Sequence, residues 1–198
     1  MTDRKPTGLV LCGGDSRRMG TDKGLLSTEG KLWVEERIQT LSSFTNRCLI
    51  SIRSEQKASY SKVLLERKLV EDSFSNIGPI SGILSAHNRY PDDDFLVLAC
   101  DMPSSDSWVF SELLKVYQTK SEIESYFCKL EGMIEPFPAI YTSRLLNEVS
   151  KRRMESDFNV SPKNILEKSN GIAIEVPKDH SNAFLNLNTL SDLSAAGL

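Results

Sequence analysis

The stretch from residue 8 to residue 24, GLVLCGGDSRRMGTDKG, constrains the fold more than any other part of the chain. Its apolar start, residues 8–12, predicts a buried strand. The adjacent glycines Gly13 and Gly14 then let the backbone turn and come close to a ligand. Three cations follow within the same loop: Arg17, Arg18 and Lys23. Backbone N–H groups of such a loop can surround an anion while the cations neutralise its charge, so the stretch predicts a phosphate-binding loop.

The spacing of this loop excludes two better-known phosphate loops. In the G-x-x-x-x-G-K-[ST] loop a hydroxyl residue follows the lysine, whereas Gly24 follows Lys23 here. The G-x-G-x-x-G loop does not fit either, because Gly13 and Gly14 are adjacent. The pattern L-x-G-G-x-S-x-R-M-G-x-D-K instead resembles the signature of nucleotidyltransferases that join a nucleoside triphosphate to a phosphorylated acceptor. Within that group it is most similar to the molybdenum cofactor guanylyltransferases, a MobA-like family.

Length and composition fit one α/β domain over residues 1–198, with 39% hydrophobic and 26% charged residues. The net charge of −3 gives no basic field for nucleic acid, so the cationic loop indicates a small anionic ligand. No apolar run approaches the roughly 20 residues of a membrane helix, and the N-terminus lacks a secretory core. We therefore expect a cytoplasmic protein that binds neither nucleic acid nor a membrane.

The four cysteines are far apart in the sequence, and none forms a C-x-x-C pair: Cys12, Cys48, Cys100 and Cys128. We expect them to be buried small side chains in a reducing compartment. A thiol nucleophile would need a base, and neither His87 nor His180 lies in a recognisable catalytic motif. Cys12 and Cys100 are nonetheless expected to line the site, because both lie at the ends of predicted strands that carry motifs.

Two further strands are predicted to end in polar residues. Residues 48–52, CLISI, read as the second parallel strand, and Ser51 near its carboxyl end is a candidate nucleotide contact. Arg53 is also a candidate, although an ordinary loop position is the favoured interpretation for it. The short strand 69–70 ends in Glu71 and Asp72. The residues alone leave a ribose or base contact and a solvated loop end equally open, and the family resemblance favours Asp72 as a nucleotide ligand.

Residues 95–100 predict a central parallel strand that leads directly into Asp101, Met102 and Pro103. A carboxylate at this strand end can hold Mg²⁺, which prefers oxygen ligands and bridges protein to phosphate. A helix cap or turn aspartate is the alternative from the residues alone, and the resemblance assigns the C-D-x-P aspartate to the metal. The preceding acidic run, residues 92–94, is expected to be a solvated turn.

Three weaker motifs extend the resemblance along the chain. G-P-x-x-G, from Gly78 to Gly82, is similar to a family motif beside the nucleotide, and a helix start with a packing glycine is its alternative; Pro79 is expected at the first helical position. Residues 136–141, PFPAIY, resemble a segment on the acceptor side, and the prolines predict incomplete pairing there. The family's N-x-N-T-P reads here as Asn186-Leu-Asn188-Thr followed by Leu190, which replaces the proline.

The order of elements predicts the fold class. Helical patterns over 32–44, 105–118 and 143–152 alternate with strands, which predicts a three-layer α/β/α, Rossmann-like domain with a mostly parallel sheet. An antiparallel pair over 124–130 and 136–141 makes the sheet mixed. The resemblance implies the nucleotide-diphospho-sugar transferase type of this fold, with an N-terminal nucleotide-binding part and a C-terminal acceptor-binding part.

The resemblance implies transfer of GMP from GTP to the phosphate of molybdenum-loaded molybdopterin, with release of pyrophosphate. The catalytic residues it implies are Arg17, Arg18, Lys23 and Asp101, with Mg²⁺ on Asp101. The nucleotide-binding residues it implies are Leu11, Cys12, Gly13, Gly14, Lys23, Ser51, Asp72, Gly78, Gly82 and Asp101. Asn186 and Asn188 would bind the acceptor.

Three alternatives to this reaction stay open from the sequence. The first is cytidylyl transfer from CTP to the same pterin, and the second is nucleotidyl transfer to a sugar or polyol phosphate. The third is a regulator or cofactor chaperone that binds the nucleotide without turnover. The expected partners are GTP and molybdopterin, together with molybdoenzyme-specific chaperones or other cofactor-biosynthesis proteins.

Overall fold

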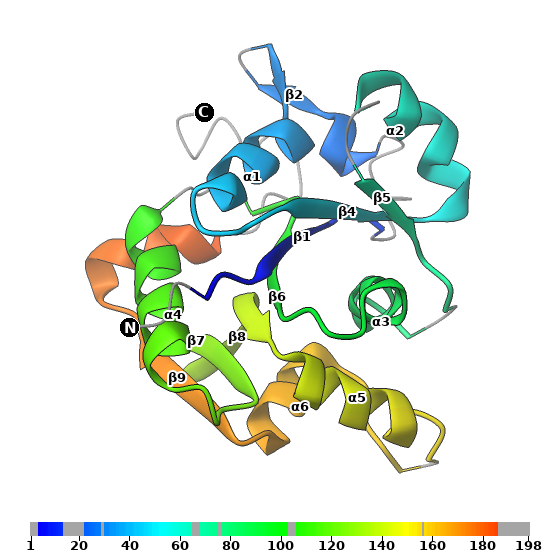
Figure 1. Cartoon of the computed structure of the whole chain (residues 1–198). Helices are drawn as coiled ribbons and strands as arrows, with labels where there is room; N and C mark the ends of the chain where they lie inside the picture. The colour runs from blue at the N-terminus through cyan, green and yellow to red at the C-terminus, as the bar shows by residue number, and fades with distance from the viewer. Residues whose placement is uncertain are drawn as a thin grey trace.

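The computed structural model describes residues 4–13, 22–28, 30–64, 68–74, 77–102, 106–155 and 157–185. Its centre is a mixed seven-stranded sheet with the order β5-β4-β1-β6-β8-β7-β9 (Figure 1). The strands are β1 (Thr7–Leu11), β4 (Cys48–Ile52), β5 (Lys68–Glu71), β6 (Phe95–Ala99), β7 (Ser125–Leu130), β8 (Met133–Tyr141) and β9 (Gly171–Glu175). Parallel pairing joins β5, β4, β1 and β6, and also β7 and β9, whereas β8 runs antiparallel to both its neighbours.

Helices cover both faces of this sheet. The α-helices are α1 (Trp33–Ser42), α2 (Lys57–Val63), α3 (Ile80–Arg89), α4 (Ser107–Thr119), α5 (Ser143–Arg152) and α6 (Pro162–Lys168). Shorter 3₁₀ helices are η2 (Lys23–Leu25), η3 (Ser54–Gln56) and η4 (Lys178–Phe184), and a small hairpin joins β2 (Ser27–Thr28) to β3 (Lys31–Leu32). None of the described helices combines the length and the apolar character that a membrane span requires.

Alternation of side chains along each strand creates two separate cores. In β1, Val10 faces the core that α1, α2, α4 and η4 cover, whereas Leu9 and Leu11 face the core under α3, α5 and α6. Figure 1 shows α1 and α2 on one side of the sheet and α3, α5 and α6 on the other. Both faces of β1, β4 and β6 are therefore buried, which is why these three strands read as continuous apolar runs. The predicted three-layer α/β/α class is confirmed.

Helix starts follow the side chains that can cap them. Asp106 accepts a hydrogen bond from the backbone N–H of Trp108 and so begins α4. Thr142 caps α5 in the same way, and Ser161 caps α6 just before Pro162. Pro79 differs from its prediction, because it is the residue before α3 rather than the first residue of that helix.

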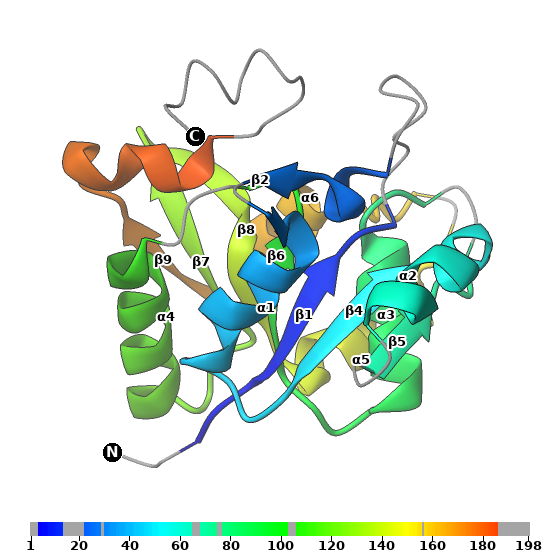
Figure 2. The ribbon, with the colours of Figure 1, turned by 90° about the horizontal axis from the view of Figure 1, so that it is seen from above.

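The strand order fixes one edge of the sheet as the place for a ligand. From β1 the chain moves outward to β4 and β5, and then returns to place β6 on the other side of β1. The carboxyl ends of β1 and β6 therefore lie side by side at a topological switch point, where open α/β sheets bind their ligands. Because β9 is parallel to β7, η4 follows β9 at this same edge, next to one end of α4 (Figure 2).

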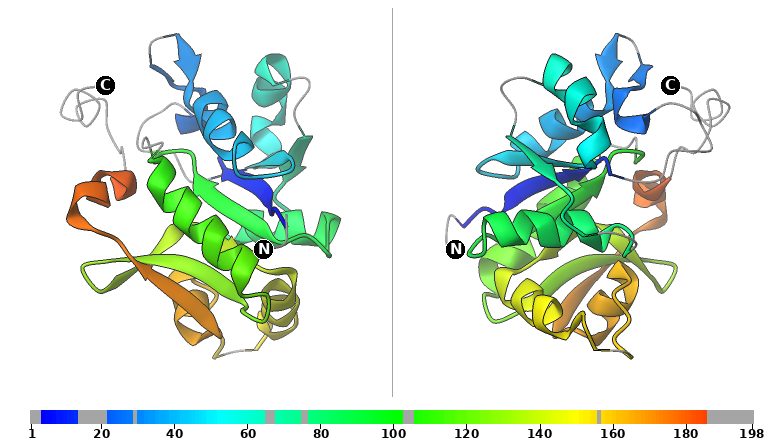
Figure 3. Two further views of the ribbon diagram at one scale, coloured as in Figure 1. Left: turned by 60° about the vertical axis from the view of Figure 1, so that its left-hand side comes forward. Right: turned by 90° about the vertical axis from the view of Figure 1, so that its right-hand side faces the viewer.

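The prolines of β8 interrupt the sheet as predicted. In the described strands β6 and β8 pair at three positions, from Phe95↔Tyr141 to Val97↔Ala139. On the other side, Phe127 lies opposite Ala139 and Cys128 lies opposite Glu135, so residues 136–138 bulge out of the ladder. Past Val97, the last residues of β6 thus continue toward the carboxyl edge without β8 beside them in the ladder. Helix α4 packs over β7 and β8 (Figure 3).

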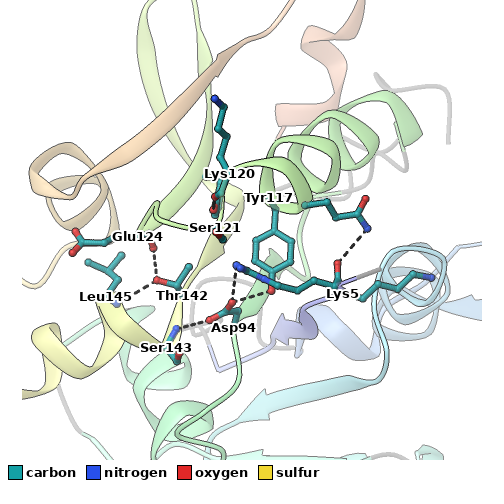
Figure 4. Close-up of polar contacts among 12 residues, drawn as sticks. Lys5, Asp94, Tyr117, Lys120, Ser121, Glu124, Thr142, Ser143 and Leu145 are labelled. Atoms are coloured by element: carbon teal, nitrogen blue, oxygen red, sulfur yellow. Dashed lines mark hydrogen bonds and ion pairs between the residues drawn. The ribbon is translucent and has the colours of Figure 1, made fainter. Parts of the chain in front are cut away.

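The prediction that residues 92–94 form a solvated turn is wrong for Asp93 and Asp94. Asp94 accepts hydrogen bonds from the Tyr117 hydroxyl at 2.8 Å and from the backbone N–H of Ser143 at 2.7 Å, and it pairs with Arg4 at 3.0 Å (Figure 4). The first turn of α5 needs an acceptor for its unpaired N–H groups, and Asp94 supplies it. Local sequence could not reveal this, since Ser143 is 49 residues away.

Candidate active site

An ion pair stands at the switch point. Lys23, the first residue of η2, places its Nζ 2.9 Å from Oδ2 of Asp101, which follows β6 by two positions. The two side chains are 16% and 25% exposed, so the pair is partly shielded from water. The sequence predicted a phosphate-binding lysine and a metal-binding carboxylate here, and the structure brings these two side chains into direct contact.

A second polar group lies on the β4 and β5 side of the loop. The backbone of Gly13 passes so close to Asp72 that a Cβ at this position would lie 2.7 Å from Oδ2 of Asp72. The Ser51 hydroxyl donates to Oδ1 of the same carboxylate at 2.6 Å. Burial raises the pKa of Asp72, and the hydrogen bond from Ser51 and the charge of Arg53 partly oppose that rise. Asp72 is therefore held in place next to the glycine loop.

Three of the predicted nucleotide contacts are buried and pack against one another: Leu11, Ser51 and Gly82. Ser51 is buried, and a Cβ on Gly82 would lie 2.2 Å from its Oγ and 3.0 Å from Cδ2 of Leu11. Gly82 is thus a packing glycine that lets α3 approach β1 and β4. Gly78 has φ +69°, a conformation that favours glycine before the helix. Ser51 thus supports the Asp72 carboxylate through its hydrogen bond, with Gly82 packed against it, and the nucleotide contacts of Ser51, Gly82 and Leu11 stay predictions from the sequence.

The two cysteines at the site are buried neighbours. Cys12 and Cys100 directly follow the paired residues Leu11 and Ala99, and the N–H of Cys100 donates to the carbonyl of Leu11 at 3.1 Å. Burial, together with contact with the Cys100 thiol, raises the pKa of Cys12 well above its ordinary value. A protonated buried thiol is a poor nucleophile, so Cys12 contributes packing at the end of β1.

Sequence reasoning missed Gln56 and Tyr60, which lie outside the motifs that carry the resemblance. Gln56 Nε2 donates to the Cys12 carbonyl at 3.0 Å and also to Asp22. The Tyr60 hydroxyl donates to Asp22 at 2.8 Å. Both side chains are buried next to the start of η2. No local motif marks them, because their partners are more than 30 residues away in the sequence.

The carboxylate of Asp101 fits the binding of a divalent cation whose other ligands come from the substrate and from water. Mg²⁺ is usually bound through one or two carboxylates together with waters and phosphate oxygens, rather than by a cage of protein ligands. Among the residues that the structure describes, no group of three His, Cys, Asp or Glu side chains could hold a metal by itself. A single, partly exposed carboxylate at the edge of the sheet agrees with that mode of binding.

Several predicted site residues lie outside the described part of the chain: Gly14, Arg17, Arg18, Asn186, Asn188 and Leu190. Their roles stay predictions from the sequence.

Comparison with known proteins gives the family. Residues 8–170 match the model of the MobA-like NTP transferase domain. The chain belongs to this family. A MobA-like relative from Clostridium perfringens strain SM101, named probable molybdenum cofactor guanylyltransferase, is 27% identical over 195 residues and covers 95% of this chain and 94% of its own. A relative of the same name from Bacillus cereus strain AH187 is 27% identical over 189 residues, covering 93% of this chain and 92% of its own.

Solved structures agree with this membership. Molybdopterin-guanine dinucleotide biosynthesis protein A from Archaeoglobus fulgidus has a TM-score of 0.76 and 26% identity, with 96% of each chain covered. A putative glucose-1-phosphate thymidylyltransferase from Bacillus anthracis has a TM-score of 0.74, covers 96% of this chain and 93% of its own, and shares 13% identity. The second likeness shows the fold alone. The chain is thus a MobA-like nucleotidyltransferase with the nucleotide-diphospho-sugar transferase fold that the sequence predicted.

Proposed function

We propose that this protein transfers GMP from GTP to the phosphate of molybdenum-loaded molybdopterin, releasing pyrophosphate and forming molybdopterin guanine dinucleotide. The observation that carries the proposal is the Lys23–Asp101 pair, 2.9 Å apart at the switch point of a nucleotidyltransferase fold. The names of the full-length relatives supply the choice of guanine and pterin.

The nucleotide would lie over the carboxyl ends of β1, β4 and β5. In this proposal Lys23, with Arg17 and Arg18, neutralises the triphosphate, and the loop backbone at Gly13 and Gly14 approaches its oxygens. Asp72 would accept hydrogen bonds from the ribose or the base, since its carboxylate already lies against Gly13. The acceptor would occupy the half that contains β7, β8 and β9, near Asn186 and Asn188.

Asp101 is the residue that would hold Mg²⁺. When bound, the cation would offset negative charge at the α-phosphate and on the leaving pyrophosphate. The Lys23 ammonium would then move from its contact with Asp101 to the phosphate oxygens. The acceptor phosphate is itself the nucleophile, so the chain needs to supply no covalent group. Its own residues would act by holding the two substrates in line and by neutralising charge.

The test is calorimetric titration with GTP, CTP, ATP and UTP, each with and without Mg²⁺, followed by a product assay with molybdenum-loaded molybdopterin. We expect selective binding of GTP and release of one pyrophosphate for each dinucleotide formed. Selective use of CTP would replace the guanylyl proposal with cytidylyl transfer. Tight GTP binding without pyrophosphate release would contradict an enzymatic role and favour a regulator or chaperone.

We also propose a cytoplasmic location and delivery of the product to cofactor-biosynthesis proteins or molybdoenzyme-specific chaperones. The support for the compartment is the state of the cysteines, which are four free thiols, three of them buried. Such thiols are typical of a reducing compartment.

A further inference from the structure

Asp22 stands next to Lys23 and is surrounded by donors from three parts of the chain. Its Oδ1 accepts from the backbone N–H of Gly24 at 3.1 Å and from the Tyr60 hydroxyl at 2.8 Å. Its Oδ2 accepts from Nε2 of Gln56. Both carboxylate oxygens are therefore engaged by protein groups. This distinguishes Asp22 from Asp101, whose Oδ2 pairs with the Lys23 ammonium and whose side chain is 25% exposed.

The donors of Asp22 are anchored in the core. Tyr60 is 0% exposed and Gln56 is 7% exposed, so water cannot readily replace their hydrogen bonds. Both polar atoms of the Gln56 amide are held in place. Its Nε2 also donates to the Cys12 carbonyl at 3.0 Å, and its Oε1 accepts from the N–H of Arg53. The Asp22 carboxylate is thereby tied to the end of β1.

The short helix η2 is seated directly on this group. A Cβ on Gly24 would lie 2.2 Å from the Tyr60 hydroxyl and 3.1 Å from Sγ of Cys12. Glycine after Lys23 is thus required by the position of Tyr60. Burial raises the pKa of Tyr60 far above its ordinary value, so its hydroxyl stays protonated and remains a donor to Asp22. Lys23 is consequently held on both sides, by Asp22 before it and by Gly24 after it.

We propose that Tyr60 and Gln56 are positioning residues for Lys23: through Asp22 they fix η2 against the end of β1 and so fix where the Lys23 ammonium meets the triphosphate. This inference rests on the triphosphate role proposed for Lys23. A lysine side chain has considerable rotamer freedom, so a fixed backbone reduces what must be ordered when the nucleotide binds. The inference also assigns Asp22 a structural task and leaves metal binding to Asp101.

The chain offers a matched pair of variants, Tyr60→Phe and Tyr117→Phe. Each removes one buried hydroxyl that donates to a carboxylate at 2.8 Å, since Tyr117 donates to Asp94. Tyr117 is 2% exposed and lies at the opposite edge of the sheet, where β6 begins (Figure 4). Loss of a hydrogen bond to a charged group should lower Tm by similar amounts in the two variants. A difference in nucleotide affinity between the two variants therefore reflects the position of Lys23 rather than a loss of stability.

We expect Tyr60→Phe to raise Kd and KM for GTP about tenfold, the effect of weakening one charge-assisted contact. The KM for the acceptor should stay near the wild-type value, and Tyr117→Phe should leave all three constants unchanged. Gln56→Met provides a second variant, which should behave as Tyr60→Phe does. Equal losses of GTP affinity in the two tyrosine variants, or no loss in either, would overturn the inference.

A double-mutant cycle tests whether Tyr60 acts through Lys23. In a Lys23→Ala background, Tyr60→Phe should cause no further loss of GTP affinity, whereas additive losses would contradict the inference. The same titrations with CTP, ATP and UTP separate the two proposals. If another triphosphate binds in place of GTP, guanylyl transfer fails and the cycle is run with that nucleotide. If the wild-type protein binds no triphosphate with Mg²⁺, both proposals are overturned.

Discussion

Replacing Asp101 with asparagine should strengthen metal-free binding of GTP. The 2.9 Å contact with Asp101 offsets the charge of Lys23 and engages one of its N–H donors, so the carboxylate competes with phosphate oxygens for the ammonium. Exposed ion pairs contribute about 0–1 kcal/mol, and this pair is better shielded, so we take ~1–2 kcal/mol for the competition. Asp101→Asn removes this competition and also a negative charge that repels the triphosphate. The Kd for GTP in EDTA should therefore fall about fivefold to thirtyfold.

With Mg²⁺ present the same variant should show the opposite behaviour. Loss of the carboxylate proposed to bind the metal should slow transfer by roughly 10²-fold or more, a magnitude typical of losing one preorganised electrostatic contact. The assay is calorimetric titration of GTP in EDTA and in Mg²⁺, with turnover measured in parallel. Asp93→Asn is the matched control, because Asp93 is 26% exposed and pairs with Arg47 at the other edge of the sheet. Unchanged or weaker metal-free binding in Asp101→Asn would refute the exchange of partners by Lys23.

Three further predictions follow from buried groups. Gly82→Ala should destabilise the fold by roughly 1–3 kcal/mol in denaturant unfolding, because its Cβ would displace the buried Ser51 hydroxyl. The loss of stability should be smaller in a Ser51→Ala background. An equal loss in that background would contradict the contact between Gly82 and Ser51. Burial raises the pKa of Asp72 above 3.8, so the folded state binds its proton more tightly and stability falls as pH rises through the folded pKa. Asp72→Asn should therefore raise Tm at pH 7 while weakening GTP binding, and a lower Tm would count against this explanation. Burial lowers the pKa of His87 below 6.5, so the unfolded state binds more protons and stability is lost as pH falls below 6.5. His87→Gln should reduce that loss between pH 7 and pH 5, and a pH profile identical to that of the wild type would refute it.

Local patterns sufficed to predict most of the fold. The strand 48–52 and the helix 143–152 have the predicted bounds, since a short apolar run and a helical spacing of apolar residues are both visible in a short window of sequence. The interruption of β8 was predictable as well, because proline lacks the N–H that a ladder needs. The short helix η4 was not predicted, because its burial depends on contacts with α4 rather than on its own pattern.

The supports of the candidate site were harder to predict than its charged residues. Lys23 and Asp101 stand in motifs, and the topology of the sheet necessarily brings the ends of β1 and β6 together. Gln56 and Tyr60 act through a carboxylate more than 30 residues away, so nothing in their own neighbourhood distinguishes them from a polar helix start. The prediction for Asp94 was wrong for a similar reason. A run of three aspartates is usually solvated, and the partner Ser143 lies 49 residues away.

The short ladder between β6 and β8 has a consequence for how such a protein can diversify. Three residue pairs join the strands that hold Lys23 and Asp101 to the strands proposed to hold the acceptor. With so little shared backbone pairing, one half can be remodelled by substitution while the geometry around the triphosphate is kept. Proteins with quite different named activities, among them the putative thymidylyltransferase of Bacillus anthracis, share this architecture. On the proposed division of the chain, nucleotide chemistry and acceptor choice are separable traits that can be inherited and exchanged independently.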